Sequence, residues 1–319
     1  MSLLLAGGRD LLLSQVSSLV PDKLVLPLTD PTDLVVAGIP PATMPHEPPP
    51  GRALRGHDHV ELQLAVLAPA GSVEQGRALA EVADGWSGHD PSAATPILVR
   101  ALPDAVVDSA LPTAPTGDLA AGDWARLGVG GDEAEAVGVD LRHTPALLVA
   151  GPPGSGRSTA LCTLARHVAT AGRPVVVVAP RPSPVTHLPA EGVAELVDPH
   201  DREAMLTLLR RHDELVVLVD DADLVLDTPV EETLVEVLRS RRGRVAVICA
   251  GATDELSATF RGLTAEVRRH RTGLLLRPSG LADGDLLGVR VRASEPGPPG
   301  RGLLVEQGVV TPVQVATSG

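Results

Sequence analysis

The stretch most clearly able to do chemistry is GPPGSGRST, at residues 151–159. Its glycines follow the pattern Gly-x-x-x-x-Gly, and Arg157 and Ser158 come directly after the second one. Glycines let the backbone turn so tightly that successive N–H groups point inward and form a nest for an anion. A helix that begins after such a turn adds the positive end of its dipole. The pattern predicts a phosphate-binding loop, although a ligand-free turn rich in glycine and proline would have the same composition.

An arginine occupies the position where phosphate-binding loops of this spacing carry a lysine. The planar guanidinium of Arg157 keeps the charge, but it does not replace a compact ammonium equivalently. Lys23 is the only lysine in the chain, so drift from lysine to arginine is a neutral explanation. An essential lysine would resist that drift, and we therefore expect phosphate binding with weak or absent hydrolysis. The residues assigned to the nucleotide are Gly151, Pro152, Pro153, Gly154, Ser155, Gly156, Arg157, Ser158 and Thr159.

A pair of aspartates follows the apolar run LVVLV at residues 215–219. An aspartate at the end of a buried strand can hold Mg²⁺ through water, so we assign this role to Asp220 and direct ligation of Mg²⁺ to the Ser158 hydroxyl. Asp221 stands where many ATPases have a glutamate that activates the attacking water, and its side chain is one methylene shorter. Asp220 and Asp221 are the candidate catalytic residues. The alternative is a strand end capped by acids before a helix.

Strands and helices alternate from about residue 121 onward. Two segments, 125–131 and 135–141, predict a hairpin, and the short apolar runs that follow have the character of strands buried on both faces. Such strands alternating with helices predict a mostly parallel sheet covered on both sides, an α/β fold. The expected strands are 144–150, 174–180, 215–221 and 244–251, and the expected helices are 158–172, 201–214, 229–243 and 253–273.

The two ends of the chain carry the same landmarks in the same order. The pair Gly51-Arg52 recurs as Gly300-Arg301 at an offset of 249, and Gln63 recurs as Gln314 at an offset of 251. Residues 1–66 therefore predict the C-terminal remnant of a preceding domain of the same kind, and we expect the natural protein to be longer, or the chain to be a fragment or the product of a split gene. Residues 67–120 predict a linker that partly packs on its neighbours, and 121–319 the nucleotide-binding domain.

Composition and charge narrow the functional classes. The net charge of −13 argues against strong non-specific DNA binding, although it permits a local basic surface. Cys162 and Cys249 lie in apolar segments and predict buried thiols in a reducing compartment. No apolar run approaches the roughly 18 residues that span a bilayer, so we expect a cytoplasmic protein. The basic clusters at 239–244 and 266–271 suit helix C-termini, with an arginine finger or a DNA-facing surface as alternatives.

The motifs together resemble the FtsK/SpoIIIE family of ring-forming ATPases, and within it the multi-domain actinobacterial architecture of the type VII secretion ATPase EccC. The resemblance rests on LGVGGDEAEAVGVDL, LLVAGPPGSGRSTAL, LVVLVDDAD, RTGLLLRP, GDLLGVRV and PPGRGLL. It implies a RecA-like P-loop NTPase fold, ATP and Mg²⁺ as ligands, and a ring or tandem assembly with upstream ATPase domains of the same or a split chain. It also implies double-stranded DNA or an exported protein as the translocated substrate, and membrane association through a region outside this chain.

Three departures from the family pattern concern hydrolysis. Arg157 replaces the lysine, Asp221 replaces the glutamate, and Ala250-Gly251 stand where active members have a Thr-Gln pair that senses the γ-phosphate. The leading hypothesis is a weakly hydrolysing or regulatory ATP-binding domain of a tandem translocase. The rivals are an active translocating ATPase and a non-enzymatic module that docks a peptide signal of an exported protein. Arg52, Arg261 and Arg301 are arginine-finger candidates.

Overall fold

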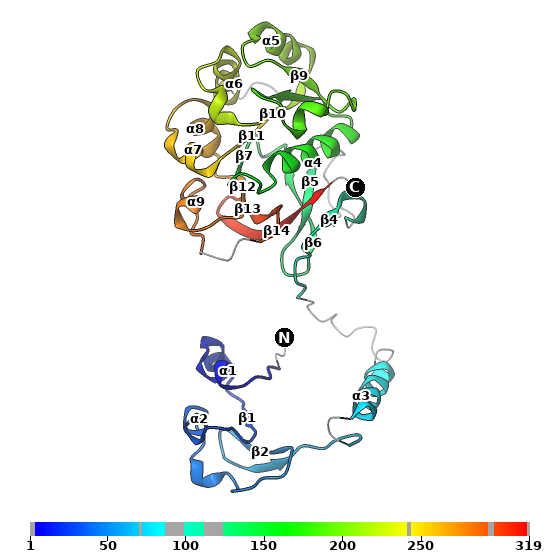
Figure 1. Cartoon of the computed structure of the whole chain (residues 1–319), viewed down its shortest axis with the longest axis vertical. Helices are drawn as coiled ribbons and strands as arrows, with labels where there is room; N and C mark the ends of the chain where they lie inside the picture. Colours follow the sequence, from blue (N-terminus) through cyan, green and yellow to red (C-terminus); the bar gives the residue numbers. More distant parts are fainter. Residues whose placement is uncertain are drawn as a thin grey trace. The chain divides into compact units, whose positions relative to one another are not determined.

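The computed structural model describes residues 4–69, 72–86, 99–111, 124–240, 244–292 and 297–317. Its contacts divide the chain into two compact units, Met1–Thr95 and Pro96–Gly319, here called unit 1 and unit 2 (Figure 1). The domain boundaries expected after residues 66 and 120 stay a prediction. One described part of the expected linker, β4 (Val106–Val107), pairs with the last strand of unit 2.

Unit 1 is built on three short antiparallel strands in the order β1-β2-β3, at Leu24–Val25, Arg52–Arg55 and Glu61–Gln63. The helical segments are α1 (Arg9–Leu13), η1 (Gln15–Leu19), α2 (Pro31–Val36), η2 (Pro41–Thr43) and α3 (Val73–Trp86). A small apolar cluster that includes Val25, Leu34 and Leu54, with Leu12 packed against it, joins α1 and α2 to this sheet.

The sheet of unit 2 has a parallel part and an antiparallel part. The parallel part is formed by β12 (Gly273–Leu276), β7 (Ala146–Ala150), β11 (Arg244–Gly251), β10 (Glu214–Val219), β8 (Val175–Val178) and β9 (Glu195–Val197), in that spatial order. The antiparallel part continues from β12 with β13 (Arg301–Glu306), β14 (Val309–Thr317), β5 (Trp124–Gly130) and β6 (Glu135–Asp140). The predicted, mostly parallel α/β fold is confirmed, and the antiparallel flank comes from the hairpins at the two ends of the unit.

Helices cover both faces of this sheet (Figure 1). Leu161 and Leu164 of α4 (Arg157–Thr170) belong to the core on one face, and Met205 and Leu234 belong to the core on the other. Strand β7 is buried along its whole length, which explains why its residues are apolar without alternation. The remaining segments are α5 (Arg202–Arg211), α6 (Pro229–Ser240), α7 (Thr253–Ala258), α8 (Gly262–Arg268), α9 (Leu281–Asp285), η3 (Asp108–Ala110), η4 (Pro184–His187) and η5 (Ala222–Val225).

The single helix expected over 253–273 is wrong, because the structure has two short helices there, α7 and α8. Gly262 has φ of +69°, a left-handed backbone conformation that residues other than glycine rarely adopt. The buried Glu231 carboxylate accepts a hydrogen bond from the N–H of Leu263 and thereby caps the second helix. The turn breaks the helical pattern at the point where this carboxylate approaches the backbone.

The repeat that the sequence predicts is one turn built twice. In unit 2, the Arg301 Nε donates to Gln314 Oε1 at 3.0 Å, and Gln314 Nε2 donates to the Pro299 carbonyl at 2.9 Å. In unit 1, Arg52 Nε donates to Gln63 Oε1 at 3.1 Å, and Gln63 Nε2 donates to the Pro50 carbonyl at 3.0 Å. The glycines before the two arginines have φ of +82° and +83°. The two sequence copies therefore share their backbone conformation as well as their side-chain pairing.

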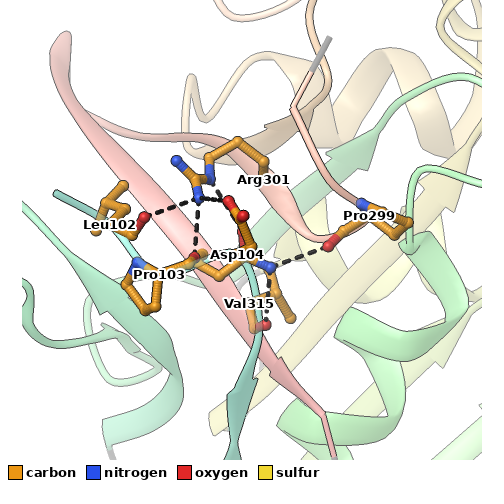
Figure 2. Close-up of polar contacts among 7 residues, drawn as sticks. Leu102, Pro103, Asp104, Pro299, Arg301 and Val315 are labelled. Atoms are coloured by element: carbon orange, nitrogen blue, oxygen red, sulfur yellow. Dashed lines mark hydrogen bonds and ion pairs between the residues drawn. The ribbon is translucent and has the colours of Figure 1, made fainter.

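The copy in unit 2 has a further contact, drawn in Figure 2. The Arg301 Nη2 donates to the carbonyl groups of Leu102 and Pro103 at 3.1 and 2.8 Å. It also lies 3.4 Å from the Asp104 carboxylate. The segment that enters β4 is thus fastened to β13 through a single guanidinium.

Candidate functional site: the loop after strand β7

The loop between β7 and α4 has the conformation that its glycines allow. Gly154 and Gly156 have φ of +74° and +101°. A Cβ on Gly151 would lie 2.6 Å from the Ser155 Oγ and 2.8 Å from the Leu276 carbonyl oxygen, so only glycine fits there. The Ser155 side chain is buried, and its hydroxyl has no hydrogen-bond partner among the described residues. Pro152, Pro153 and Gly154 form the exposed tip.

The loop is anchored from the antiparallel flank of the sheet. The N–H of Gly300 donates to the Ser155 carbonyl at 2.8 Å, and a Cβ on Gly156 would lie 3.1 Å from the Gly300 nitrogen. The turn before Arg301 therefore holds the loop through the backbone of Ser155. The copy of this turn in unit 1 has the same backbone conformation.

The first residues of α4 meet the end of β10. The Ser158 hydroxyl donates to Asp220 Oδ2 at 2.9 Å, and Asp220 is 3% exposed. The Ser183 hydroxyl donates to the same carboxylate oxygen at 2.7 Å. Thr159 lies one residue further into the helix, and its carbonyl accepts from the Thr163 hydroxyl at 3.0 Å. The structure thus brings together the serine and the aspartate predicted to share a metal ion.

Ser183 belongs to a third segment that sequence reasoning missed, the loop after β8. β8 lies beside β10 in the sheet, so the ends of the two strands point to the same edge. The only sequence signal was the run APRPSP at residues 179–184, a proline-rich loop directly after a buried strand. Its two polar side chains, Arg181 and Ser183, both reach the aspartate pair.

The second aspartate is held by two arginines. Arg181 Nε donates to Asp221 Oδ2 at 2.5 Å, and Arg157 Nη2 lies 3.9 Å from Asp221 Oδ1. The hydrogen bond with Asp221, followed by its charge, raises the pKa of Arg181 above its usual value. Asp221 itself has φ of +46° in the turn that follows β10. The Asp221 carboxylate thus has an arginine side chain beside each of its two oxygens.

The position of the expected γ-phosphate sensor lies beside the loop and carries no polar side chain. Gly251, the last residue of β11, is in register with Ala150 of β7. Its carbonyl accepts from the N–H of Gly151 at 3.4 Å. Ala250 is fully buried. Ala250 and Gly251 therefore offer the loop backbone groups and no polar side chain.

The arginine-finger candidates are engaged inside the chain. Arg261 binds the Asp227 carboxylate through two hydrogen bonds of 2.8 and 2.7 Å. Arg52 and Arg301 hold the two repeated turns. In the basic clusters, Arg239 and Arg269 both donate to Glu266. Residues 241–243 of the first cluster lie outside the described residues.

Within the described ranges, no three His, Cys, Asp or Glu residues are grouped so as to hold a metal ion. No helix in the part of the chain that the structure describes is long and apolar enough to cross a membrane.

The sheet order and the paired motifs give unit 2 the fold of a P-loop NTPase, and residues 140–269 match the family model of the AAA domain. A search of curated protein sequences finds no match. Among solved structures, the chain is similar to EssC (ATPases 2 and 3) from Geobacillus thermodenitrificans, with 17% identity over 93% of this chain and 61% of that chain and a TM-score of 0.58.

A second similar structure is Thermomonospora curvata EccC (ATPases 2 and 3) in complex with a signal sequence peptide. The identity is 20% over 95% of this chain and 59% of that chain, and the TM-score is 0.57. The pCW3 conjugation coupling protein TcpA, in a monomer form with ATPgS, matches with 13% identity over 68% of this chain and 71% of that chain and a TM-score of 0.50. The resemblance to EccC-type ATPase domains is thereby confirmed at the level of the fold. The chain spans about 60% of the length of the EssC and EccC structures with two ATPase domains.

Proposed function

We propose that unit 2 binds ATP with Mg²⁺ and hydrolyses it slowly, as a regulatory domain of a tandem ATPase. The observation that carries this proposal is the 2.9 Å hydrogen bond between Ser158 and Asp220, directly after a loop whose glycines Gly154 and Gly156 have positive φ. The loop would hold the phosphates with its backbone N–H groups and with Arg157. Ser158 would ligate the metal, and Asp220 would orient it through water. Bound magnesium would supply positive charge that offsets the phosphate oxygens.

The residues present fit this ligand. The Ser155 hydroxyl and the Arg157 Nη1 are buried polar groups without hydrogen-bond partners among the described residues. Buried polar groups normally have a partner, so two such groups in one loop indicate that a ligand supplies the missing acceptors and donors. The solved TcpA structure contains ATPgS, which supports a nucleotide as the ligand of this fold.

Slow hydrolysis follows from the side chain of Asp221 and from the sensor position. A general base must reach the proton of the attacking water, and the Asp221 side chain is one methylene shorter than the glutamate that does this in active ATPases. The strand that would present a polar sensor ends in Ala250 and Gly251. With a shorter base and without a polar sensor, the site activates the water less well and has fewer hydrogen bonds to the charge that develops on the phosphate.

Calorimetry and phosphate release on the same preparation test the proposal. We expect the full chain to bind ATP in the presence of Mg²⁺ and to release phosphate far more slowly than an active ATPase of this fold. Asp220→Asn should remove most of the Mg²⁺ dependence of binding, whereas Asp198→Asn, outside the site, should retain it. Absence of ATP binding would refute the nucleotide site, and rapid turnover that Asp220→Asn abolishes would establish the active-translocase alternative.

We also propose that unit 1 is the end of a preceding ATPase domain, of the same or a split chain. Its strands β1, β2 and β3 have the order and pairing of β12, β13 and β14. The match to two-domain structures of EssC and EccC extends over more than nine-tenths of this chain, which supports a tandem assembly. The reading frame before Met1, or a neighbouring gene, should encode a second phosphate-binding loop. A frame and neighbours without such a loop would contradict the assignment.

We favour an exported polypeptide over DNA as the macromolecular substrate. The net charge of −13 opposes phosphate contacts on the scale that DNA binding needs. The similar EccC structure contains a signal sequence peptide, which supports a polypeptide substrate. Two similar structures are cytoplasmic domains of EccC and EssC, and they support a cytoplasmic location as part of this proposal. Capture of a secreted protein that ATP neither promotes nor displaces would favour the docking-module alternative over the ATP-regulated one.

A further inference from the structure

The cluster formed by Arg157, Arg181 and Asp221 joins two guanidinium groups to one carboxylate, and the charges of Asp223 and Asp220 also act on Arg181. Both guanidinium groups approach this single carboxylate, one on each oxygen. The Arg157 side chain is 14% exposed, and its Nη1 has no hydrogen-bond partner among the described residues. A buried guanidinium N–H without an acceptor costs free energy, and a phosphate oxygen is an acceptor that would also match its charge.

The two arginines differ in their freedom to move. Arg157 begins α4 and its side chain is mostly buried, whereas the Arg181 side chain lies within the loop after β8 and is 59% exposed. Arg181 can therefore leave Asp221 without disturbing the core. Asp221 is 7% exposed and is fixed by the left-handed turn after β10, so the carboxylate stays in place when its partners change.

We propose that Arg181 is the residue that distinguishes nucleoside triphosphates from diphosphates, and that Asp221 is the counter-ion that holds both arginines until a terminal phosphate replaces it. The inference rests on the proposed nucleotide binding. A terminal phosphate carries more negative charge than one carboxylate and accepts bidentate hydrogen bonds from a guanidinium. The loop after β8 already enters the site through Ser183, so Arg181 needs only a change of side-chain conformation to reach a phosphate beyond Arg157.

This assignment gives Asp221 a role different from that of a general base. The Asp221 carboxylate and a terminal phosphate would compete for the same two cations. Its removal frees them, so it should strengthen triphosphate binding. A general base or a structural acid would behave differently, because its removal would leave binding unchanged or weaken it.

The experiment compares affinities of the full chain for a non-hydrolysable ATP analogue and for ADP, both with Mg²⁺, by calorimetry. Arg181→Gln should weaken binding of the analogue about tenfold, the effect of losing one charge-assisted hydrogen bond, and should change ADP binding less than about twofold. Arg181→Lys should restore part of the difference. Arg202→Gln, an exposed arginine of α5 paired with Glu236, is the matched control and should change neither affinity. Asp221→Asn should tighten analogue binding several-fold.

The outcomes separate this inference from the proposed function. If the wild-type chain binds both nucleotides and Arg181→Gln leaves their affinity ratio unchanged, the inference is wrong while the nucleotide site stands. If Asp221→Asn weakens analogue binding, the counter-ion role is likewise wrong. If the wild-type chain binds neither nucleotide, the proposed function is wrong and the inference with it. Thermal unfolding of each variant shows that a lost affinity is not a lost fold.

Discussion

Substitution of Gln314 tests whether the repeated turn supports the nucleotide-binding unit. Gln314 is 2% exposed, accepts a hydrogen bond from Arg301, and donates one to the Pro299 carbonyl. This turn carries Gly300, whose N–H holds the Ser155 carbonyl of the loop. Gln314→Ala should therefore destabilise unit 2 and loosen the loop.

The expected magnitude follows from the bonds that are lost. A hydrogen bond from a charged donor contributes about 1.5–3 kcal/mol and a neutral one about 1 kcal/mol, so the two together amount to about 3 kcal/mol. Arg301 keeps its bonds to Leu102 and Pro103, which limits the loss. We expect the free energy of unfolding of unit 2 to fall by about 3 kcal/mol.

Denaturant unfolding followed by Trp124 fluorescence, in a Trp86→Phe background, measures this loss, because Trp124 begins β5 of unit 2. The repeat provides a matched control. Gln63 makes the same two bonds in unit 1 but is exposed, so Gln63→Ala should leave the Trp124 transition unchanged. A loss below about 1 kcal/mol for Gln314→Ala, or an equal effect of Gln63→Ala on the same transition, would refute the reasoning.

Two further predictions concern titratable groups. Burial raises the pKa of the Cys162 thiol to about 11, so maleimide labelling of this residue at pH 8 should be much slower in the native chain than in denaturant; equal rates would contradict the burial. Burial, followed by the charge of Arg126, lowers the pKa of His167, although Asp108 acts in the opposite direction. Because the unfolded chain then binds a proton that the folded chain does not, stability should fall as the pH drops below about 6.5, and His167→Gln should abolish this slope. A wild-type chain whose stability is constant over that range would contradict the second prediction.

The strands and the loop after β7 were predictable because their signals are local. A buried parallel strand needs a continuous apolar run, and a tight anion nest needs glycines at fixed spacing. The prediction of one helix over 253–273 was wrong because a single glycine in a helical pattern can lie either inside a helix or at a break between two helices. The Glu231 carboxylate that stabilises the break at Gly262 comes from α6 and is distant in sequence.

The repeat was predictable from the matching Gly-Arg and Gln positions, whereas the contact of Arg301 with the segment before β4 was not. The sequence shows that Arg52 and Arg301 occupy equivalent places, and the pairing with Gln63 and Gln314 follows the predicted offsets. The attachment of Arg301 to Leu102 joins residues almost two hundred positions apart. No spacing rule reaches that far, because the contact depends on where β4 enters the sheet.

The sequence by itself determined the α/β class, the position of the phosphate-binding loop and the strand end that carries the two aspartates, since these depend on periodicity and on residue types next to one another. Only the tertiary structure decided which partners the second aspartate has. The order of strands in the sheet places β8 beside β10, and this neighbourhood brings Arg181 to Asp221 across forty residues of chain. The order of the strands depends on how both faces of the sheet pack against the helices. The arginine partners of Asp221 therefore could not be predicted from local sequence patterns.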